Sequence, residues 1–554
     1  MKQQQKENNF LVHGGILAVA SVVVRFIGLI YRIPMVNIIG SEGNGYYSTA
    51  YSVYSILLLL SSYSLPLAVS KMVSARIAKG KWKETMRVLI VSLVYAFIFG
   101  TGFALITYFL ADFFCATVMK SPMAAIPLKW MAPTVFIVAF LGVLRGFFQG
   151  MQTTIPTAIS QIVEQIINAV VSVGMAAILV QYGVELAVER NMAAYEPAWG
   201  AAGGTIGTGA GALFALIFCM VIFIGFSKHL RKYIQRDRHT KKIESYSSLT
   251  RILFLTAVPV ILSTASYNCV DIIDNAVFNN YMNRAGYTFT EYNSIWGDYN
   301  SAYLLIVHLP VALASAVGAA LVPSLTAAFE TRDKKAVLSK ISLTIRVTLL
   351  VAIPCAFGLI AVGGNLAKLL FGGIADEAQK YLVAGGLAVI FYSLATVTNA
   401  ILQGLDHVEK PMLHALISLA VHVLFLLLFL YVFKLEIFAV ILAYVLFSLT
   451  MSVLNMISIY RLTGYLPEPL HTILLPAGIS AVVVIFCFVI SFVISRFMSG
   501  RPMHLVIVLL CLIFGAAIYI AGIFLTGCLS KEQILELPLG ERILGFAEKL
   551  HLIR

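Results

Sequence analysis

Long apolar segments recur along almost the whole chain of 554 residues, separated by short polar breaks. A hydrocarbon layer of about 30 Å is crossed by roughly 20 apolar residues of helix. Because that layer offers no hydrogen-bond partner to the backbone, such segments cross it as α-helices. We therefore predict an all-α polytopic membrane protein with about fourteen transmembrane spans, at residues 10–33, 46–70, 87–110, 124–148, 156–180, 200–227, 250–280, 297–328, 338–362, 380–403, 412–433, 436–460, 472–495 and 503–527.

Composition excludes the common soluble classes of protein. Hydrophobic residues make up 60% of the chain and charged residues only 12%, whereas soluble domains are about 25% charged. The seven cysteines are scattered without a Cys-x-x-Cys pair or a Cys/His cluster, so we expect neither a metal site nor a disulfide framework. No nucleotide-binding loop or hydrolase motif is present, and we expect a protein that is not an enzyme and binds no nucleic acid.

Basic residues gather in alternate connections, and this pattern predicts the orientation. Cytoplasmic loops of membrane proteins are enriched in Lys and Arg, which also explains the net charge of +13. The first apolar segment lacks a cleavage signal and is interpreted as a retained span. We expect both termini on the cytoplasmic side of a bacterial plasma membrane, with the following residues inside: Lys71, Arg76, Lys79, Lys81, Lys83, Arg87, Lys228, Arg231, Lys232, Arg236, Arg238, Lys241, Lys242, Arg251, Arg332, Lys334, Lys335, Lys340 and Arg346.

An internal repeat predicts two lobes. The motif G-x-Y-x-x-A-Y occurs at Gly45 and again at Gly297, and a Gln-Gly pair occurs at Gln149 and again at Gln403. Six spans separate the equivalents, so the halves run in the same direction through the membrane, as parallel repeats do. We predict a first lobe at 10–227, a basic cytoplasmic linker at 228–249, a second lobe at 250–461, two unpaired helices at 472–527 and an amphipathic cytoplasmic tail at 530–554.

Charged residues inside spans are costly and are therefore candidates for function. Arg25 and Arg32 lie seven residues apart on one face of the first span, where guanidinium groups could bind a phosphate in a central cavity. The alternatives are an ion pair between helices for Arg25 and snorkelling for Arg32.

Hydroxyl groups line one face of the second span. These residues could contact a sugar in the cavity, or the serines could simply pack helices together. Together with the two residues at matching positions of the eighth span, the candidate substrate-binding set is Ser48, Tyr51, Ser52, Ser55, Asn300 and Tyr303, beside Arg25 and Arg32.

Acidic residues and one histidine are candidates for gating or ion coupling. Glu164 could bind a coupling ion, or could pair with a basic residue such as Arg145. An arginine of one lobe facing an aspartate of the other, such as Arg25 and Asp271, would form an outer gate or a pair of substrate and ion sites, or remain a permanent bridge. The gating and coupling set is Glu164, Asp271, Asp274, Asp298 and His308, with packing as the alternative for the histidine.

Residues 25–34, residues 39–47 and the repeated Gln-Gly pairs resemble the multidrug/oligosaccharidyl-lipid/polysaccharide exporter (MOP) superfamily. Within it, the chain is similar to bacterial polysaccharide biosynthesis proteins of the stage V sporulation protein B and MurJ lipid II flippase type. The resemblance covers essentially the whole chain. It implies that residues 472–527 form a groove for a polyprenyl tail beside the central cavity.

Three functions remain open from the sequence. The first is alternating-access translocation of an undecaprenyl-pyrophosphate-linked saccharide, with the peptidoglycan precursor lipid II as the expected cargo. The second is cation-coupled drug export of the MATE type, and the third is a membrane scaffold for envelope assembly. We expect no cofactor beyond a coupling Na⁺ or H⁺, and we expect the bilayer, the lipid-linked substrate and cell-wall synthesis enzymes as partners.

Overall fold

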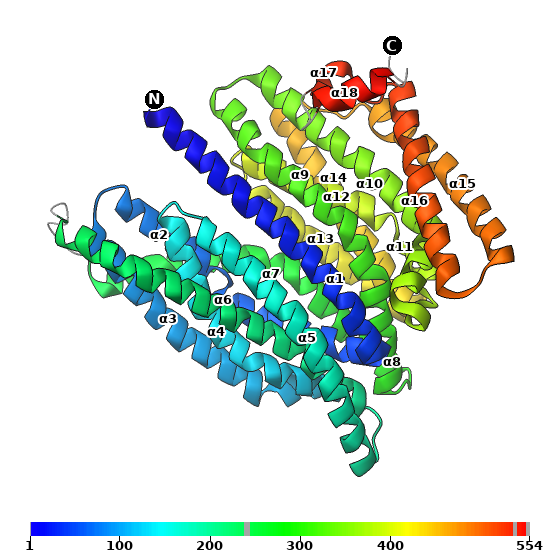
Figure 1. The fold of residues 1–554 in the computed structure, drawn as a ribbon, viewed down its shortest axis with the longest axis horizontal. Helices are drawn as coiled ribbons and strands as arrows, with labels where there is room; N and C mark the ends of the chain where they lie inside the picture. The colour runs from blue at the N-terminus through cyan, green and yellow to red at the C-terminus, as the bar shows by residue number, and fades with distance from the viewer. Residues whose placement is uncertain (1, 238–243, 536–539, 550–554) are drawn as a thin grey trace. The chain divides into compact units, whose positions relative to one another are not determined.

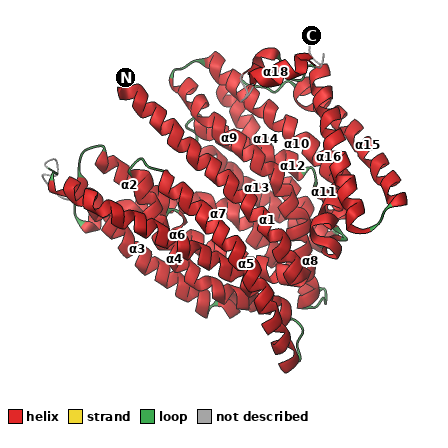
Figure 2. Cartoon of the chain, viewed as in Figure 1, coloured by secondary structure: helices red, strands yellow, loops and turns green. Residues whose placement is uncertain are grey.

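The computed structural model describes residues 2–237, 244–535 and 540–549 of the chain. Within these ranges every regular element is helical, as the apolar segments predict (Figures 1 and 2). Ten helices there are long and apolar enough to cross a membrane, and up to eleven if the bent pair α11 (Ala378–Gly385) and α12 (Ala388–Gly404) counts as one span. The chain is therefore a multi-pass membrane protein, while the number fourteen stays a prediction.

A single glycine replaces the polar loop that we expected between the first two spans. Helix α1 runs from Lys2 to Leu58, and Gly40 is its one residue with non-helical backbone angles, at φ +71° and ψ −179°. Glycine adopts this positive φ without steric cost, so the chain turns at one residue and stays helical on both sides. The second arm continues through the π-helical turn η1 (Leu59–Tyr63) into α2 (Leu65–Ile77).

The first compact unit comprises Met1–Gly297. After α2 it contains α3 (Trp82–Phe109), the short turns η2 (Phe113–Val118) and η3 (Pro122–Ala124), α4 (Ala125–Gly150), α5 (Ile155–Glu189) and α6 (Tyr195–Gln235). Glycines let α5 and α6 pack with their backbones in close contact. A Cβ atom at Gly203 would lie 2.4 Å from the Met175 carbonyl oxygen, and one at Gly207 would lie 2.1 Å from Ser172 Oγ. Small residues of this kind allow the close approach that stabilises helix pairs in membranes.

Helix α7 belongs to the first unit, not to the second lobe in which the repeat placed it. It runs from Tyr246 to Arg284, is followed by α8 (Phe289–Asp298), and contacts α1, α2 and α3. The division between the units falls after Gly297, well beyond the predicted linker at 228–249. Hydrogen bonds explain this placement, because Asn275 donates to Thr49 Oγ1 at 2.9 Å and Asn279 donates to the Met119 carbonyl at 2.9 Å.

The second compact unit, Asp298–Arg554, is organised around α10. Helix α10 contacts α9, α11, α12, α15 and α16, and α14 packs on α12 and α13. The elements of this unit, besides α11 and α12, are η4 (Tyr299–Leu304), α9 (Leu305–Glu330), α10 (Lys334–Phe371), η5 (Gly372–Ala375), α13 (Glu409–Leu427), η6 (Leu428–Val432), α14 (Ile437–Thr463), η7 (Leu470–Leu474), α15 (Leu475–Phe497), α16 (Gly500–Leu525), α17 (Lys531–Leu535) and α18 (Gly540–Lys549).

One buried arginine fastens the C-terminal tail of the second unit. Arg346 of α10 forms an ion pair with Glu468 at 2.9 Å and donates to Gln533 Oε1 of α17 at 3.0 Å. His471 and Arg346 together hold the pKa of the Glu468 carboxyl below its ordinary value. Ile534 is buried beside this contact, so α17 docks on the unit through both apolar and polar groups.

Candidate functional site

Arg32 lies at the centre of a polar group inside the first unit. Its half-buried guanidinium interacts with the hydroxyls of Tyr31, Tyr47 and Tyr51. The kink at Gly40 explains how these residues meet, because it brings the second arm of α1 alongside the first. Tyr47 and Tyr51, one helical turn apart, stack with their ring centroids 6.1 Å apart. The sequence placed Tyr51 in the cavity wall but did not connect it to Arg32.

A hydrogen-bond chain supports Arg32 from α5 and α6. Asn168 Nδ2 donates to the Tyr31 hydroxyl at 3.4 Å, and Ser172 Oγ is 2.8 Å from both Asn168 Oδ1 and the carbonyl oxygen of Gly204. Asn168 and Ser172 are buried. These two buried residues of α5 therefore support Tyr31 beside Arg32 and do not face lipid.

Arg25 differs sharply from Arg32. Its side chain is exposed, and no hydrogen bond or ion pair joins it to any residue within the described ranges. The ion pair between helices that we considered for Arg25 is thus not formed with the described residues.

The hydroxyl-rich face of the second arm of α1 is largely satisfied by its own backbone. Ser48 donates to the Asn44 carbonyl at 2.8 Å, Ser52 to the Thr49 carbonyl at 2.9 Å, and Ser55 to the Ser52 carbonyl at 2.8 Å. Their hydrogens are therefore engaged, and only the oxygen lone pairs are left to accept bonds from a ligand. These contacts favour helix packing for the serines, and their place in a binding site stays a prediction.

Glu164 forms the ion pair that the sequence offered as its structural alternative. Its Oε2 atom lies 2.7 Å from Arg145 Nη2, and Arg145 Nε donates to Ser160 Oγ at 2.9 Å. Both side chains are mostly buried, with 22% of Glu164 and 13% of Arg145 exposed. Glu164 lies one helical turn before Asn168 on α5, so the pair belongs to the same polar region.

The aspartates of α7 fall within the first unit, which changes the gate that we expected. Asp271 is exposed and Asp274 is 1% exposed, and both lie on the helix that contacts α1. The hypothesis of an arginine on one lobe facing Asp271 on the other does not fit this division, because Arg25 and Asp271 are in the same unit.

The remaining candidates belong to the second unit. Tyr303 is buried and donates to the Gly385 carbonyl at 3.1 Å, and its ring stacks on Tyr299 at 5.5 Å. His308 Nε2 lies 2.9 Å from the Tyr444 hydroxyl, while Tyr444 stacks on Tyr392. Asp298 and Asn300 are half-buried in the same stretch of chain. Tyr392 and Tyr444 were missed, since nothing in the sequence connects residues of α12 and α14 to His308.

The repeated motif brings its two glycines together. A Cβ atom at Gly45 would lie 2.0 Å from the Asn293 carbonyl oxygen, and one at Gly297 would lie 1.8 Å from the Ser41 carbonyl oxygen. Asn44 Nδ2 donates to the Gly297 carbonyl at 2.7 Å. Only glycine permits this contact between α1 and α8, so the motif serves packing within the first unit.

No group of three or more His, Cys, Asp or Glu side chains in residues 2–237, 244–535 and 540–549 is placed to hold a metal ion.

Comparison with known protein families shows to which family the chain belongs. The family described as polysaccharide biosynthesis protein matches residues 11–329, more than half of the chain. The chain belongs to this family. Lipid II flippase MurJ of Bacillus subtilis (strain 168) is 25% identical over 556 residues, which cover 96% of this chain and 97% of that protein. Stage V sporulation protein B of the same organism is 32% identical over 143 residues, which are 26% of this chain and 28% of that protein.

Solved structures share the fold. An inward-facing multidrug resistance MATE family transporter of the MOP superfamily aligns with a TM-score of 0.62 at 15% identity, over 80% of this chain and 98% of that one. The lipid II flippase MurJ in an inward closed conformation aligns with a TM-score of 0.59 at 14% identity, over 91% and 97%. The expected membership of the MOP superfamily is thus confirmed.

Proposed function

We propose that this protein is a flippase that moves a lipid-linked saccharide with an anionic head group across the plasma membrane. The observation that carries the proposal is the pair of arginines on α1, one of them exposed and unpaired among the described residues. A pyrophosphate offers oxygen atoms that match the fork of a guanidinium, which makes it a suitable external partner. The similarity to MurJ over nearly the full length supports a lipid-linked precursor as cargo.

We further propose lipid II as the cargo, with α15 and α16 holding its polyprenyl chain. Both helices are almost wholly apolar, and only 11% of the apolar stretch of η7 and α15 is buried. Large apolar side chains that remain exposed on them are Val482, Ile485, Phe488, Val489, Phe492, Leu509, Leu512 and Ile513. Such a surface suits an acyl or prenyl chain and offers nothing to a sugar.

Transport by this route requires access to the head group from each side of the membrane in turn. We propose alternating access by the two units, with both termini on the cytoplasmic side and Na⁺ or H⁺ as the coupling ion. Glu164 is a weak candidate for the coupling carboxylate, because Arg145 already neutralises its charge. That arrangement also argues against a cation-binding drug site at this position.

The test is head-group translocation by the full chain in proteoliposomes containing defined fluorescent lipids. A charge-assisted hydrogen bond contributes about 1.5–3 kcal/mol, so losing one should slow flipping of lipid II about 10- to 100-fold. We expect this loss for Arg25→Ala and for Arg32→Ala, with little recovery in Arg25→Lys because an ammonium lacks the bidentate fork.

Lys79→Ala is the matched control, since Lys79 is an exposed cation in the turn after α2. It should flip at the wild-type rate. Undiminished flipping by both arginine variants would refute the proposed phosphate contact. Equal transport of a polyprenol without phosphate would refute the anionic cargo.

A further inference from the structure

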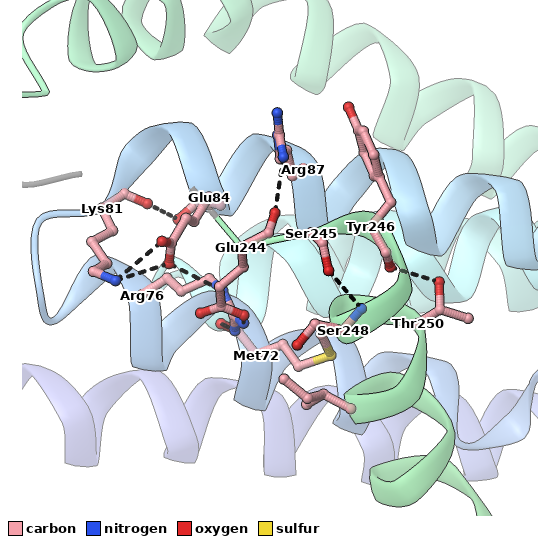
Figure 3. Close-up of polar contacts among 12 residues, drawn as sticks. Met72, Arg76, Lys81, Glu84, Arg87, Glu244, Ser245, Tyr246, Ser248 and Thr250 are labelled. Carbon is pink, nitrogen blue, oxygen red and sulfur yellow. Dashed lines mark hydrogen bonds and ion pairs between the residues drawn. The ribbon is translucent and has the colours of Figure 1, made fainter. Parts of the chain in front are cut away.

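The connection between α6 and α7 is held at both of its described ends. The sequence predicted a basic linker at 228–249, where two lobes would join. The structure describes the ends of that connection at Arg236–Asp237 and Glu244–Ser245. Within the first unit, the end at Glu244 lies against the end of α2 and the start of α3 (Figure 3), and the end at Asp237 lies against the first turn of α3.

The end next to α7 is held by two arginines. Arg76 Nη2 donates to Glu244 Oε2 at 2.6 Å, and Arg87 Nη1 donates to the Glu244 carbonyl oxygen at 2.8 Å. The Arg87 guanidinium also lies over the Tyr246 ring, 4.7 Å from its centroid, at the first turn of α7. Ser245 caps α7, since its hydroxyl accepts from the Ser248 backbone N–H.

The end next to α6 is held by the first turn of α3. The backbone N–H of Lys83 donates to Asp237 Oδ2 at 2.9 Å, which supplies an acceptor to the open N-terminus of α3. Asp237 is only 7% exposed. One turn earlier, the Tyr233 ring stacks on Trp82 with centroids 4.5 Å apart.

A buried carboxylate joins these contacts into one cluster. Glu84 is 0% exposed, and its oxygens lie 3.1 Å from Lys81 Nζ and 3.8 Å from Arg76 Nε. Arg76 therefore forms ion pairs with both Glu84 and Glu244. Its Nη1 also donates to the Met72 carbonyl at 3.0 Å. A carboxylate this deeply buried is tolerated only while its cations stay in place, so opening the cluster would leave a buried charge uncompensated.

We propose that this cluster is a permanent strap that fixes α7 to the first unit, so that the α6–α7 connection does not act as the joint of the transport cycle. The strap comprises Arg76, Lys81, Glu84 and Arg87 on one side and Asp237 and Glu244 on the other. Contacts at both ends of the connection restrict the movement of the first turn of α7 relative to α2 and α3. The hydrogen bonds of Asn275 and Asn279 hold the same helix further along.

Hydrogen–deuterium exchange on the purified full chain tests the strap without any substrate. In Glu84→Gln and in Glu244→Gln, exchange of backbone amides at 244–258 should rise at least several-fold over the wild-type rate. Glu185→Gln is the matched control, because Glu185 is an exposed acid near the C-terminal end of α5 and does not belong to the strap. It should leave the exchange at 244–258 unchanged. Wild-type exchange at 244–258 in both test variants would overturn the proposal.

A disulfide tests whether the strap stays closed throughout the transport cycle, even if Glu84→Gln fails to fold. A cysteine pair at Lys83→Cys and Asp237→Cys joins two residues already in contact. If the strap stays closed throughout the cycle, the oxidised protein should flip lipid at the rate of the reduced protein. A loss of flipping that reductant restores would overturn the proposal. This second readout depends on the proposed function, whereas the exchange measurement does not, so failure of one is distinguishable from failure of the other.

Discussion

Among single residues, Glu164 shows that the role inferred for a charged side chain depends on the residue that packs against it. In the sequence, Glu164 is an acidic residue within an apolar segment, which makes it a candidate for ion coupling. In the structure Arg145 lies 2.7 Å away and Ser160 completes the contact. The charge of a carboxylate paired with a guanidinium is already compensated, so it attracts a coupling cation weakly.

We predict that Arg145→Met lowers the stability of the protein by about 2 kcal/mol, because it leaves a mostly buried carboxylate without its cation. The double variant Arg145→Met/Glu164→Met should recover most of that loss and keep lipid flipping, since a structural pair can be replaced by apolar groups. Thermal unfolding in detergent measures the first effect, and the proteoliposome assay measures the second.

Lys129→Met is the control for this experiment, since Lys129 forms an exposed ion pair with Asp112 and should shift the unfolding midpoint little. A double variant that is stable but unable to flip lipid would assign Glu164 a direct part in transport, against our expectation.

Among whole elements, the contact between α1 and α8 explains why the repeated motif has a glycine at each of its two occurrences. Gly45 and Gly297 stand at equivalent positions of the motif, and each comes so close to the opposing backbone that a methyl group would not fit. Tyr292 of α8 also donates its hydroxyl to the Lys120 carbonyl, and burial raises the pKa of Tyr292 to about 12. The hydroxyl therefore stays protonated and able to donate at any physiological pH.

We predict that Gly45→Ala destabilises the protein by about 1–3 kcal/mol, the usual range for overpacking a tight contact. The added methyl group would meet the Asn293 carbonyl oxygen at 2.0 Å and push α8 away from α1. Gly102→Ala is the control, because no atom lies within 4 Å of a Cβ atom there. Unfolding midpoints of the two variants should differ clearly, and equal midpoints would contradict the contact.

At the scale of the whole molecule, the charge distribution fixes the expected orientation in the membrane. The basic turn after α2, the strap and the start of α10 should share the cytoplasmic side, while the connection between α5 and α6 should face outward. Arg190 there is the single basic residue among Glu185, Glu189 and Glu196.

We predict that a cysteine at Asn191 reacts with a membrane-impermeant maleimide added to intact cells, whereas a cysteine at Lys334 reacts only after the membrane is opened. Both positions are exposed at the ends of long helices, so the difference reports the side of the membrane. The reverse labelling pattern would invert the topology and place the strap outside.

The sequence by itself determined that this is a helical membrane protein, because repeated apolar segments can satisfy their backbone in lipid only as helices. Its resemblance at residues 25–34 and 39–47 identified the MOP superfamily. It also placed Arg25 and Arg32 on α1 and Glu164 on α5, since a charged residue is visible as a break in an apolar run. Tertiary structure alone decided which partner each of these groups has. The kink at Gly40 brings Tyr47 to Arg32, the approach of α4 to α5 neutralises Glu164, and hydrogen bonds from Asn275 and Asn279 hold α7 in the first unit. These outcomes depend on side chains far apart in the chain, and local pattern carries no information about such contacts.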